Sequence, residues 1–308
     1  DIAIAFMIAF MTAFMATPHT INLANKVGAV DEPKDERRIN KVTMPRLGGL
    51  AVIAGFFVSI VYLLIVMVME NKINLYEESY NLKLMGFGIG ALIIGVTCFI
   101  DDVKGVPALG KLVAQIAAAL VVVKSGIRID TLDIPFFNIA NASPTFYAGL
   151  TVVWIVGITN AMNLIDGLDG LSTGISLIAC LSLLIIFSLN GSPLISIVLI
   201  TALGGALCGF LPYNFNPAKT FIGDTGSNFL GYCLSIISIL GIAKTYTAIV
   251  IVAPLMVLAL PIFDTLFAIV RSIIKGKSLK AVIMPDRGHL HHKMLDKGYT
   301  QKQEELIL

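Results

Sequence analysis

Acidic and amide side chains form three short clusters in a chain that is otherwise strongly apolar. Asp101 and Asp102 are adjacent and follow an apolar run, while segment 160–170 reads NAMNLIDGLDG and segment 214–227 reads NFNPAKTFIGDTGS. Carboxylate oxygens are ligands that Mg²⁺ prefers, and bound Mg²⁺ commonly recruits phosphate groups. The clusters therefore favour magnesium-assisted chemistry on a phosphate compound.

Each acidic cluster also has a purely structural explanation. The Asp101-Asp102 pair fits a solvated helix end, segment 163–169 fits an acidic loop, and segment 224–227 fits a helix N-cap. Asp166 and Asp169 are three residues apart, so they share a face if a helix continues through them. Segment 160–170 contains no basic residue. This lack favours a metal ion or a ligand as the partner of its acids.

Two further polar segments carry cations. Segment 287–292, RGHLHH, holds three of the four histidines. A zinc site is disfavoured here, because no cysteine accompanies the histidines. Its side chains fit better as donors to phosphate, with Arg287 as a fixed cation. Segment 44–49, MPRLGG, follows Lys41. Lys41 and Arg46 could steer an anionic substrate, whereas the glycine pair is equally explained by close helix packing.

The composition places these clusters in a membrane protein. The 308 residues are 56% hydrophobic and 14% charged, with a mean hydropathy of +0.87. A membrane span needs about 20 apolar residues and must satisfy its own backbone, which helices do. We predict one all-α, polytopic integral membrane domain over residues 1–308. Its nine apolar runs are 2–18, 47–69, 84–100, 108–124, 146–162, 172–190, 194–212, 226–243 and 247–271.

Charge distribution predicts the orientation of these runs. Alternating connections put 17 of the 22 Lys and Arg residues on one side, leaving Lys72, Lys83, Lys124, Arg128 and Lys244 on the other. The positive-inside rule makes the basic side cytoplasmic, with the N-terminus outside. All five polar clusters fall on that side. The first run lacks a basic flank and is expected to be a span, and 306–308 could open another one.

The clusters together resemble a known family. Asp101-Asp102, NLIDGLDGL, NPAKTFIGDTGS and RGHLHH occur in the order and spacing of the polyprenyl-phosphate N-acetylhexosamine-1-phosphate transferases, from about Lys41 to Lys293. Members usually have ten or eleven spans, so the resemblance implies one or two more at the C-terminus. They move a sugar-1-phosphate from a UDP-sugar to a polyprenyl phosphate with Mg²⁺, for which Mn²⁺ could substitute, and release UMP. The histidines are interrupted by Leu290, which resembles the UDP-N-acetylglucosamine branch.

The resemblance also implies roles for individual residues. The implied metal ligands are Asp224, Asp101 and Asp102; the catalytic residues are Asp101, Asp102, Asp166, His291 and His292; the substrate-binding residues are Lys41, Asn163, Asp169, Phe221, Arg287 and His289. Asp169 and Phe221 are expected to hold uracil, although Phe221 could simply pack. Pro254 and Pro261 predict a kinked last run that opens a groove for the lipid tail.

The expected activity is transfer of N-acetylglucosamine-1-phosphate to undecaprenyl phosphate in the bacterial inner membrane. This would be the first membrane step of teichoic acid or O-antigen synthesis. Two alternatives stay open: the phospho-MurNAc-pentapeptide transferase of peptidoglycan synthesis, and a cation-coupled transporter, whose acids should lie near the bilayer midplane. No nucleic-acid partner is expected. The sequence leaves the oligomeric state open, with a homodimer as one option.

Overall fold

The computed structural model describes residues 2–32, 43–70, 78–130, 133–134, 137–138 and 143–241. Eight helices lie in this part of the chain: α1 (Ile2–Val27), α2 (Gly49–Met69), α3 (Glu78–Lys104), α4 (Ala108–Lys124), α5 (Pro144–Ile165), α6 (Leu171–Leu189), α7 (Leu194–Asn214) and α8 (Gly223–Leu240). Eight of the nine predicted apolar runs fall here, and each forms a helix. The ninth run, 247–271, lies outside the described residues with its two prolines.

Six of these helices, α1, α2, α3, α5, α6 and α7, are long and apolar enough to cross a membrane. Helix α6 shows how their outer faces look, because Ile178, Leu181, Ile185 and Leu189 are all exposed on it. Such an apolar surface suits lipid rather than water. The predicted all-α, polytopic membrane fold is therefore confirmed.

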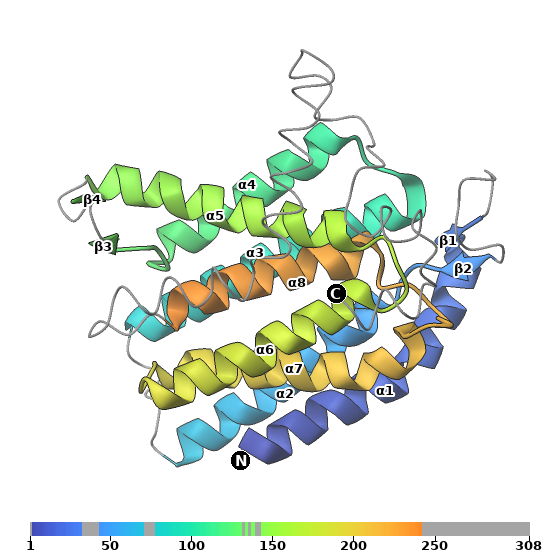
Figure 1. The fold of residues 1–308 in the computed structure, drawn as a ribbon, viewed down its shortest axis with the longest axis horizontal. Coiled ribbons are helices and arrows are strands. Elements are labelled where there is room, and N and C mark those ends of the chain that lie inside the picture. Colours follow the sequence, from blue (N-terminus) through green and yellow to red (C-terminus); the bar gives the residue numbers. More distant parts are fainter. Residues whose placement is uncertain are drawn as a thin grey trace.

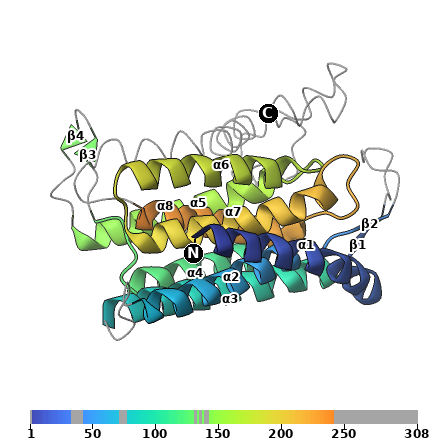
Figure 2. The same cartoon turned by 90° about the horizontal axis from the view of Figure 1, so that it is seen from below.

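Helix α8 lies at the centre of the bundle (Figure 1), where it contacts α2, α3, α5, α6 and α7. In the perpendicular view, α6 lies on one side of α8, and α2, α3 and α4 lie on the other (Figure 2). Within residues 223–239 only Asp224 is not fully buried. Since protein surrounds α8, its Ser, Thr and Asn side chains can find polar partners on neighbouring helices.

Glycines allow the close approaches around α8. A Cβ at Gly231 would lie 2.5 Å from Thr159 Cα on α5. A Cβ at Gly49 would overlap Gly226, and one at Gly48 would lie 2.5 Å from the Phe210 ring. Small residues let helix backbones meet in this way. The packing explanation for the Gly48-Gly49 pair therefore agrees with the structure.

Two short antiparallel ladders mark opposite ends of the bundle (Figure 1). Strand β1 (Val30–Asp31) pairs with β2 (Met44–Pro45), with Val30 opposite Pro45, and β3 (Asp133–Ile134) pairs with β4 (Phe137–Asn138). The amide of Arg46 also donates to Ala29 O at 3.0 Å, which extends the first ladder. Helices α3, α5 and α7 end, and α8 begins, at the β1–β2 end. The polar clusters of the sequence that are described meet there.

Candidate active site

The first turn of α8 is capped by a residue of another helix. Asp102 Oδ1 accepts a hydrogen bond from Asp224 N at 3.0 Å, and Asp102 Oδ2 accepts from Thr225 N at 2.8 Å and Thr225 Oγ1 at 2.6 Å. The N-cap residue Ile222 supplies no side-chain bond. The amides of a first helical turn have no partners within their helix, and negative charge is favourable beside them. The buried carboxylate of Asp102 therefore ties the end of α3 to the start of α8.

The chain before α2 is docked on the same turn. Gly48 N donates to Phe221 O at 3.0 Å, Gly49 N donates to Ile222 O at 2.9 Å, and Phe221 N donates to Pro45 O at 2.8 Å. Gly223 has a φ of +70°, and a Cβ there would overlap Arg46 O. Glycine is the residue that adopts this backbone without strain and leaves room for the neighbour. Segment 43–49 is thereby held so that Arg46 reaches the carboxylates.

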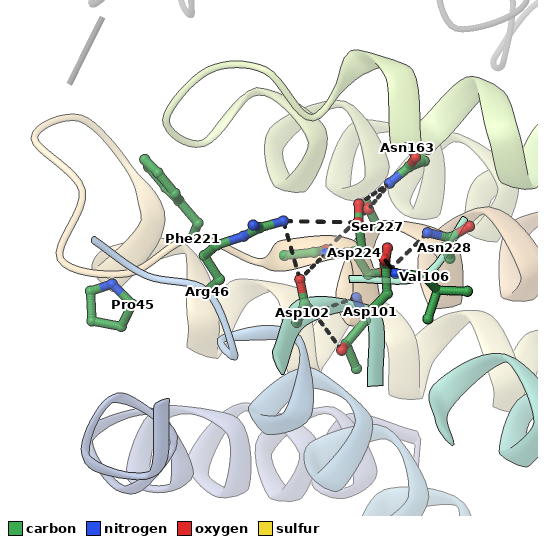
Figure 3. A network of polar contacts seen from close by, with 12 residues as sticks. Pro45, Arg46, Asp101, Asp102, Val106, Asn163, Phe221, Asp224, Ser227 and Asn228 are labelled. Atoms are coloured by element: carbon green, nitrogen blue, oxygen red, sulfur yellow. Dashed lines mark hydrogen bonds and ion pairs between the residues drawn. The ribbon is translucent and has the colours of Figure 1, made fainter. Parts of the chain in front are cut away.

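Three carboxylates and two cations meet at this point, and Figure 3 labels the carboxylates together with one of the cations, Arg46. Arg46 Nη2 lies 3.4 Å from Asp102 Oδ1 and 3.8 Å from Asp224 Oδ2. Lys111 Nζ, from the first turn of α4, lies 2.8 Å from Asp101 Oδ2 and 3.3 Å from Asp224 Oδ2. Asp101 Oδ1 also accepts from Val106 N at 2.6 Å. Asp224 is thus the shared partner of both cations.

Helix α5 supplies a further contact to Asp224. Asn163 Nδ2 donates to Asp224 Oδ1 at 2.6 Å and to Ser227 Oγ at 2.9 Å. Burial alone would raise the pKa of Asp224, but its side-chain contact with Asp101, together with Lys111, Asn163 and Arg46, holds that pKa below its ordinary value. Asp224 therefore stays ionised at neutral pH.

The helix does not continue through Asp166 and Asp169. Helix α5 ends at Ile165, and Gly170, with a φ of +71°, precedes α6. Asp166 Oδ1 accepts from Ser172 Oγ at 2.7 Å, whereas Asp169 Oδ2 accepts from Asn216 Nδ2 and Ala218 N, each at 3.1 Å. The two acids therefore do not share a helical face. Asp169 instead ties turn 166–170 to loop 215–222.

The surroundings of Asp166 disfavour its ionised form. Burial raises its pKa to about 7; the hydrogen bond from Ser172 opposes this rise, and the negative charges of Asp224 and Asp102 add to it. A group whose ionised form is disfavoured by neighbouring anions regains a low pKa when a cation arrives. A cation bound near Asp224 would therefore lower the pKa of Asp166 as well.

The carboxylate oxygens of the site are ligands that suit Mg²⁺, although protein atoms alone would not complete its coordination shell. Within the described residues no three His, Cys, Asp or Glu side chains are grouped closely enough to hold one metal ion. Mg²⁺ is usually held by one or two carboxylates, with substrate phosphates and waters completing its shell. Asp101 and Asp224, which share the Lys111 ammonium, are two neighbouring carboxylates of the kind that such a site would use. The oxygens of Asp102 already accept bonds from α8.

The structure brings together some of the predicted site residues and leaves others aside. Asp101, Asp102, Asn163 and Asp224 meet directly, and Asp166 and Asp169 lie in the adjoining turn. The half-buried Phe221 points away from Asp102 and Asp224 (Figure 3). The predicted residues Lys41, Arg287, His289, His291 and His292 lie outside the described residues.

Sequence reasoning missed Lys111 as a site residue. A positive charge is unfavourable in the first turn of a helix, because the helix dipole is positive there. Lys111 occupies that position in α4, so its placement was a usable signal for a specific anionic partner. Gln115 and Asn228 were missed too, although each is an amide inside an otherwise apolar run, and Asn160 was noted in its cluster without a role.

Comparison with known proteins identifies this arrangement. The family model described as glycosyl transferase family 4 matches residues 84–242, which include the acids, the amides and Lys111 of the site but not segment 43–49 with Arg46. The chain belongs to this family. A probable undecaprenyl-phosphate N-acetylglucosaminyl 1-phosphate transferase of Bacillus subtilis (strain 168) is 38% identical over 307 residues, covering 100% of this chain and 81% of the relative.

Two further relatives match most or all of the chain. A decaprenyl-phosphate N-acetylglucosaminephosphotransferase of Mycobacterium tuberculosis is 33% identical over 332 residues, covering 100% of this chain and 79% of the relative. A phospho-N-acetylmuramoyl-pentapeptide-transferase of Staphylococcus haemolyticus is 36% identical over 252 residues, covering 76% of this chain and 74% of the relative. The predicted family is confirmed, and the glycosyl transferase family 4 protein is a sugar-1-phosphate transferase.

Proposed function

We propose that the protein transfers N-acetylglucosamine-1-phosphate from UDP-N-acetylglucosamine to undecaprenyl phosphate and releases UMP. The observation that carries this proposal is the meeting of Asp101, Asp224, Arg46 and Lys111 at one end of the helix bundle. A lipid acceptor and a water-soluble donor can meet at such an end without either leaving its own phase. The names of the relatives that match the whole chain support a polyprenyl phosphate acceptor and transfer of N-acetylglucosamine-1-phosphate.

The reaction is a displacement at phosphorus. An oxygen of the lipid phosphate forms a bond to the sugar-bearing phosphorus, and the bond from that phosphorus to the bridging oxygen breaks, so UMP leaves with the electron pair. The second pKa of a phosphate monoester is about 6, so the acceptor needs little help in losing a proton. Catalysis then depends on positioning and on stabilising the negative charge of the diphosphate.

The described residues divide this work. We assign Asp224 and Asp101 as the carboxylates that would hold Mg²⁺, which would offset the negative charge that develops on the diphosphate. Asp102 holds the first turn of α8 in place. Arg46 and Lys111 supply positive charge beside Asp224, where an incoming phosphate would meet it. Asn163 fixes the orientation of the Asp224 carboxylate.

Other roles follow from the resemblance. We propose that Asp166 lines the same centre, that Asp169 and Phe221 hold the uracil, and that the 287–292 tract and Lys41 face the donor. Asp169 already orders loop 215–222, so it would act on the base together with that loop.

The donor and the pathway belong to the proposal as well. The RGHLHH segment and the full-length matches to N-acetylglucosamine-1-phosphate transferases favour UDP-N-acetylglucosamine over UDP-MurNAc-pentapeptide. We propose a place in the bacterial inner membrane with the active site cytoplasmic and the N-terminus outside, from the distribution of Lys and Arg. The product would begin an envelope polymer such as teichoic acid or O-antigen.

A donor panel tests the proposal. The purified protein is incubated with undecaprenyl phosphate, Mg²⁺ and either UDP-N-acetylglucosamine or UDP-MurNAc-pentapeptide, and UMP release is followed. We expect UMP only with the first donor. UMP release with the pentapeptide donor alone would assign the protein to peptidoglycan synthesis instead.

A further inference from the structure

A second set of polar side chains lies one helical turn beyond the site. On α4, Gln115 follows Lys111 by four residues; on α5, Asn160 precedes Asn163 by three; on α8, Asn228 follows Asp224 by four. Residues three or four apart lie on the same face of a helix. The three amides therefore form a layer, which we call the amide layer (Gln115, Asn160 and Asn228), beneath the layer of Lys111, Asn163 and Asp224.

The amide layer is connected throughout. Gln115 Nε2 donates to Asn228 Oδ1 at 2.9 Å and to Asn160 Oδ1 at 3.3 Å, and Asn160 Nδ2 donates back to Gln115 Oε1 at 2.6 Å. Asn228 Nδ2 donates to Asp224 O at 2.9 Å, which links the layer to the site above it. Gln115 and Asn228 are 3% and 1% exposed. Water therefore has little access to these side chains and cannot readily replace their hydrogen bonds.

We infer that the amide layer is a positioning device, which sets the register of α4, α5 and α8 so that Lys111 and Asn163 both reach Asp224. A buried polar network with every member bonded makes a structure rigid and unique, whereas apolar side chains would allow the helices to slide. Since Lys111 and Asn163 bond opposite oxygens of Asp224, a small slide or rotation of α4 or α5 would break one bond. Among the described residues, none of the three amide side chains is hydrogen-bonded to a carboxylate side chain.

The inference rests on the proposed role of Asp224 in sugar-1-phosphate transfer, and it is tested by kinetics of the full-length protein. Gln115→Met keeps the length and volume of the side chain but removes every bond of its amide. We expect kcat to fall by about tenfold to 100-fold, since misplacement of about 1 Å has that effect, with KM for both substrates changed less than about twofold. Asn228→Leu should act in the same way, and it serves as the second variant if Gln115→Met does not fold.

A double-mutant cycle separates positioning from mere stability. If Gln115 acts by aligning Asn163 with Asp224, Gln115→Met should lower kcat far less in an Asn163→Ala background than in the wild type. Trp154→Phe is the matched control, because Trp154 Nε1 also joins α5 to α8, donating to Ser235 O and Ser238 Oγ at 3.2 Å, far from the site. It should lower the melting temperature and leave kcat unchanged.

The outcomes distinguish the inference from the proposed function. Full turnover by the Asp224→Asn variant would contradict the assignment of Asp224 to the active site, and with it the proposed function. Loss of turnover in Asp224→Asn, combined with a wild-type kcat in folded Gln115→Met and Asn228→Leu, would overturn the amide layer alone. Multiplicative losses in the Gln115→Met/Asn163→Ala protein, or a rise in KM without a fall in kcat, would overturn it too.

Discussion

Asp102 of α3 and Thr225 of α8, 123 residues apart in the sequence, are joined by two hydrogen bonds to one carboxylate oxygen. The bonds come from the backbone amide and the hydroxyl of Thr225, so Asp102 replaces the missing side-chain cap of α8. Asp224 precedes Thr225 directly. The position of the central carboxylate of the site is therefore set by a residue of a different helix.

Asp102→Asn should destabilise the protein and inactivate it. The amide has one acceptor oxygen, and its NH₂ group would face the donors of α8, leaving a buried donor without a partner. Each such group costs about 1–3 kcal/mol. Thermal unfolding in detergent should show a lower melting temperature, and turnover should fall at least about tenfold. Thr225→Ser keeps both bonds and should behave as the wild type; an unchanged melting temperature for Asp102→Asn would contradict the capping role.

Turnover should require Mg²⁺ or Mn²⁺. Among the described residues, three carboxylates and two cations meet at the site, so a divalent ion would be needed to bring the diphosphate beside Asp101 and Asp224. Chelation with EDTA should stop UMP release, and added Mg²⁺ should restore it. Asp224→Asn should lose turnover while keeping a cooperative thermal transition. Full activity in EDTA would rule out the metal-dependent mechanism.

Lys111→Met should lower kcat by about tenfold to 100-fold. The substitution keeps the length of the side chain but removes the charge that lies between Asp101 and Asp224, so their repulsion would displace Asp224 and a phosphate would meet less positive charge. Lys111→Arg, which keeps the charge, should retain more activity than Lys111→Met. Equal activity in the two variants would show that the charge at this position is not used.

The two ends of the bundle should be accessible from opposite sides of the membrane. Lys219, in loop 215–222, is exposed at the site end, and Asp130 is exposed before β3 at the other end. In a background with the four native cysteines replaced by Ala, Lys219→Cys should react with a membrane-impermeant maleimide only from the cytoplasmic side. Asp130→Cys should react only from outside. Labelling of both from one side would contradict the proposed orientation.

The sequence predicted the helices well because lipid imposes a simple rule. A span must be long and apolar, and eight predicted runs agree with helices α1 to α8 to within about ten residues at each end. Convergence of Asp101, Asn163 and Asp224 could also be predicted, because helices that alternate in direction bring every second connection to the same end.

Other features of the site depend on contacts between separate helices, which a local sequence pattern does not predict. The turn at Gly167 and Gly170 ended α5 before Asp166, so the shared face of Asp166 and Asp169 did not form. The bond between Asp102 and Thr225 and the amide layer join residues of separate helices. Lys111 carried a signal in its unfavourable place at a helix N-terminus, but its partners could be named only from the structure.

The most direct test of the central claim is the identity of both products. Undecaprenyl phosphate and UDP-N-acetylglucosamine are incubated with the protein, and the lipid and nucleotide products are analysed together by mass spectrometry. The account predicts equal amounts of UMP and a lipid carrying N-acetylglucosamine through a diphosphate. Release of UDP, with the sugar attached to the lipid through a single phosphate, would show that the sugar moves without its phosphate and would contradict the account.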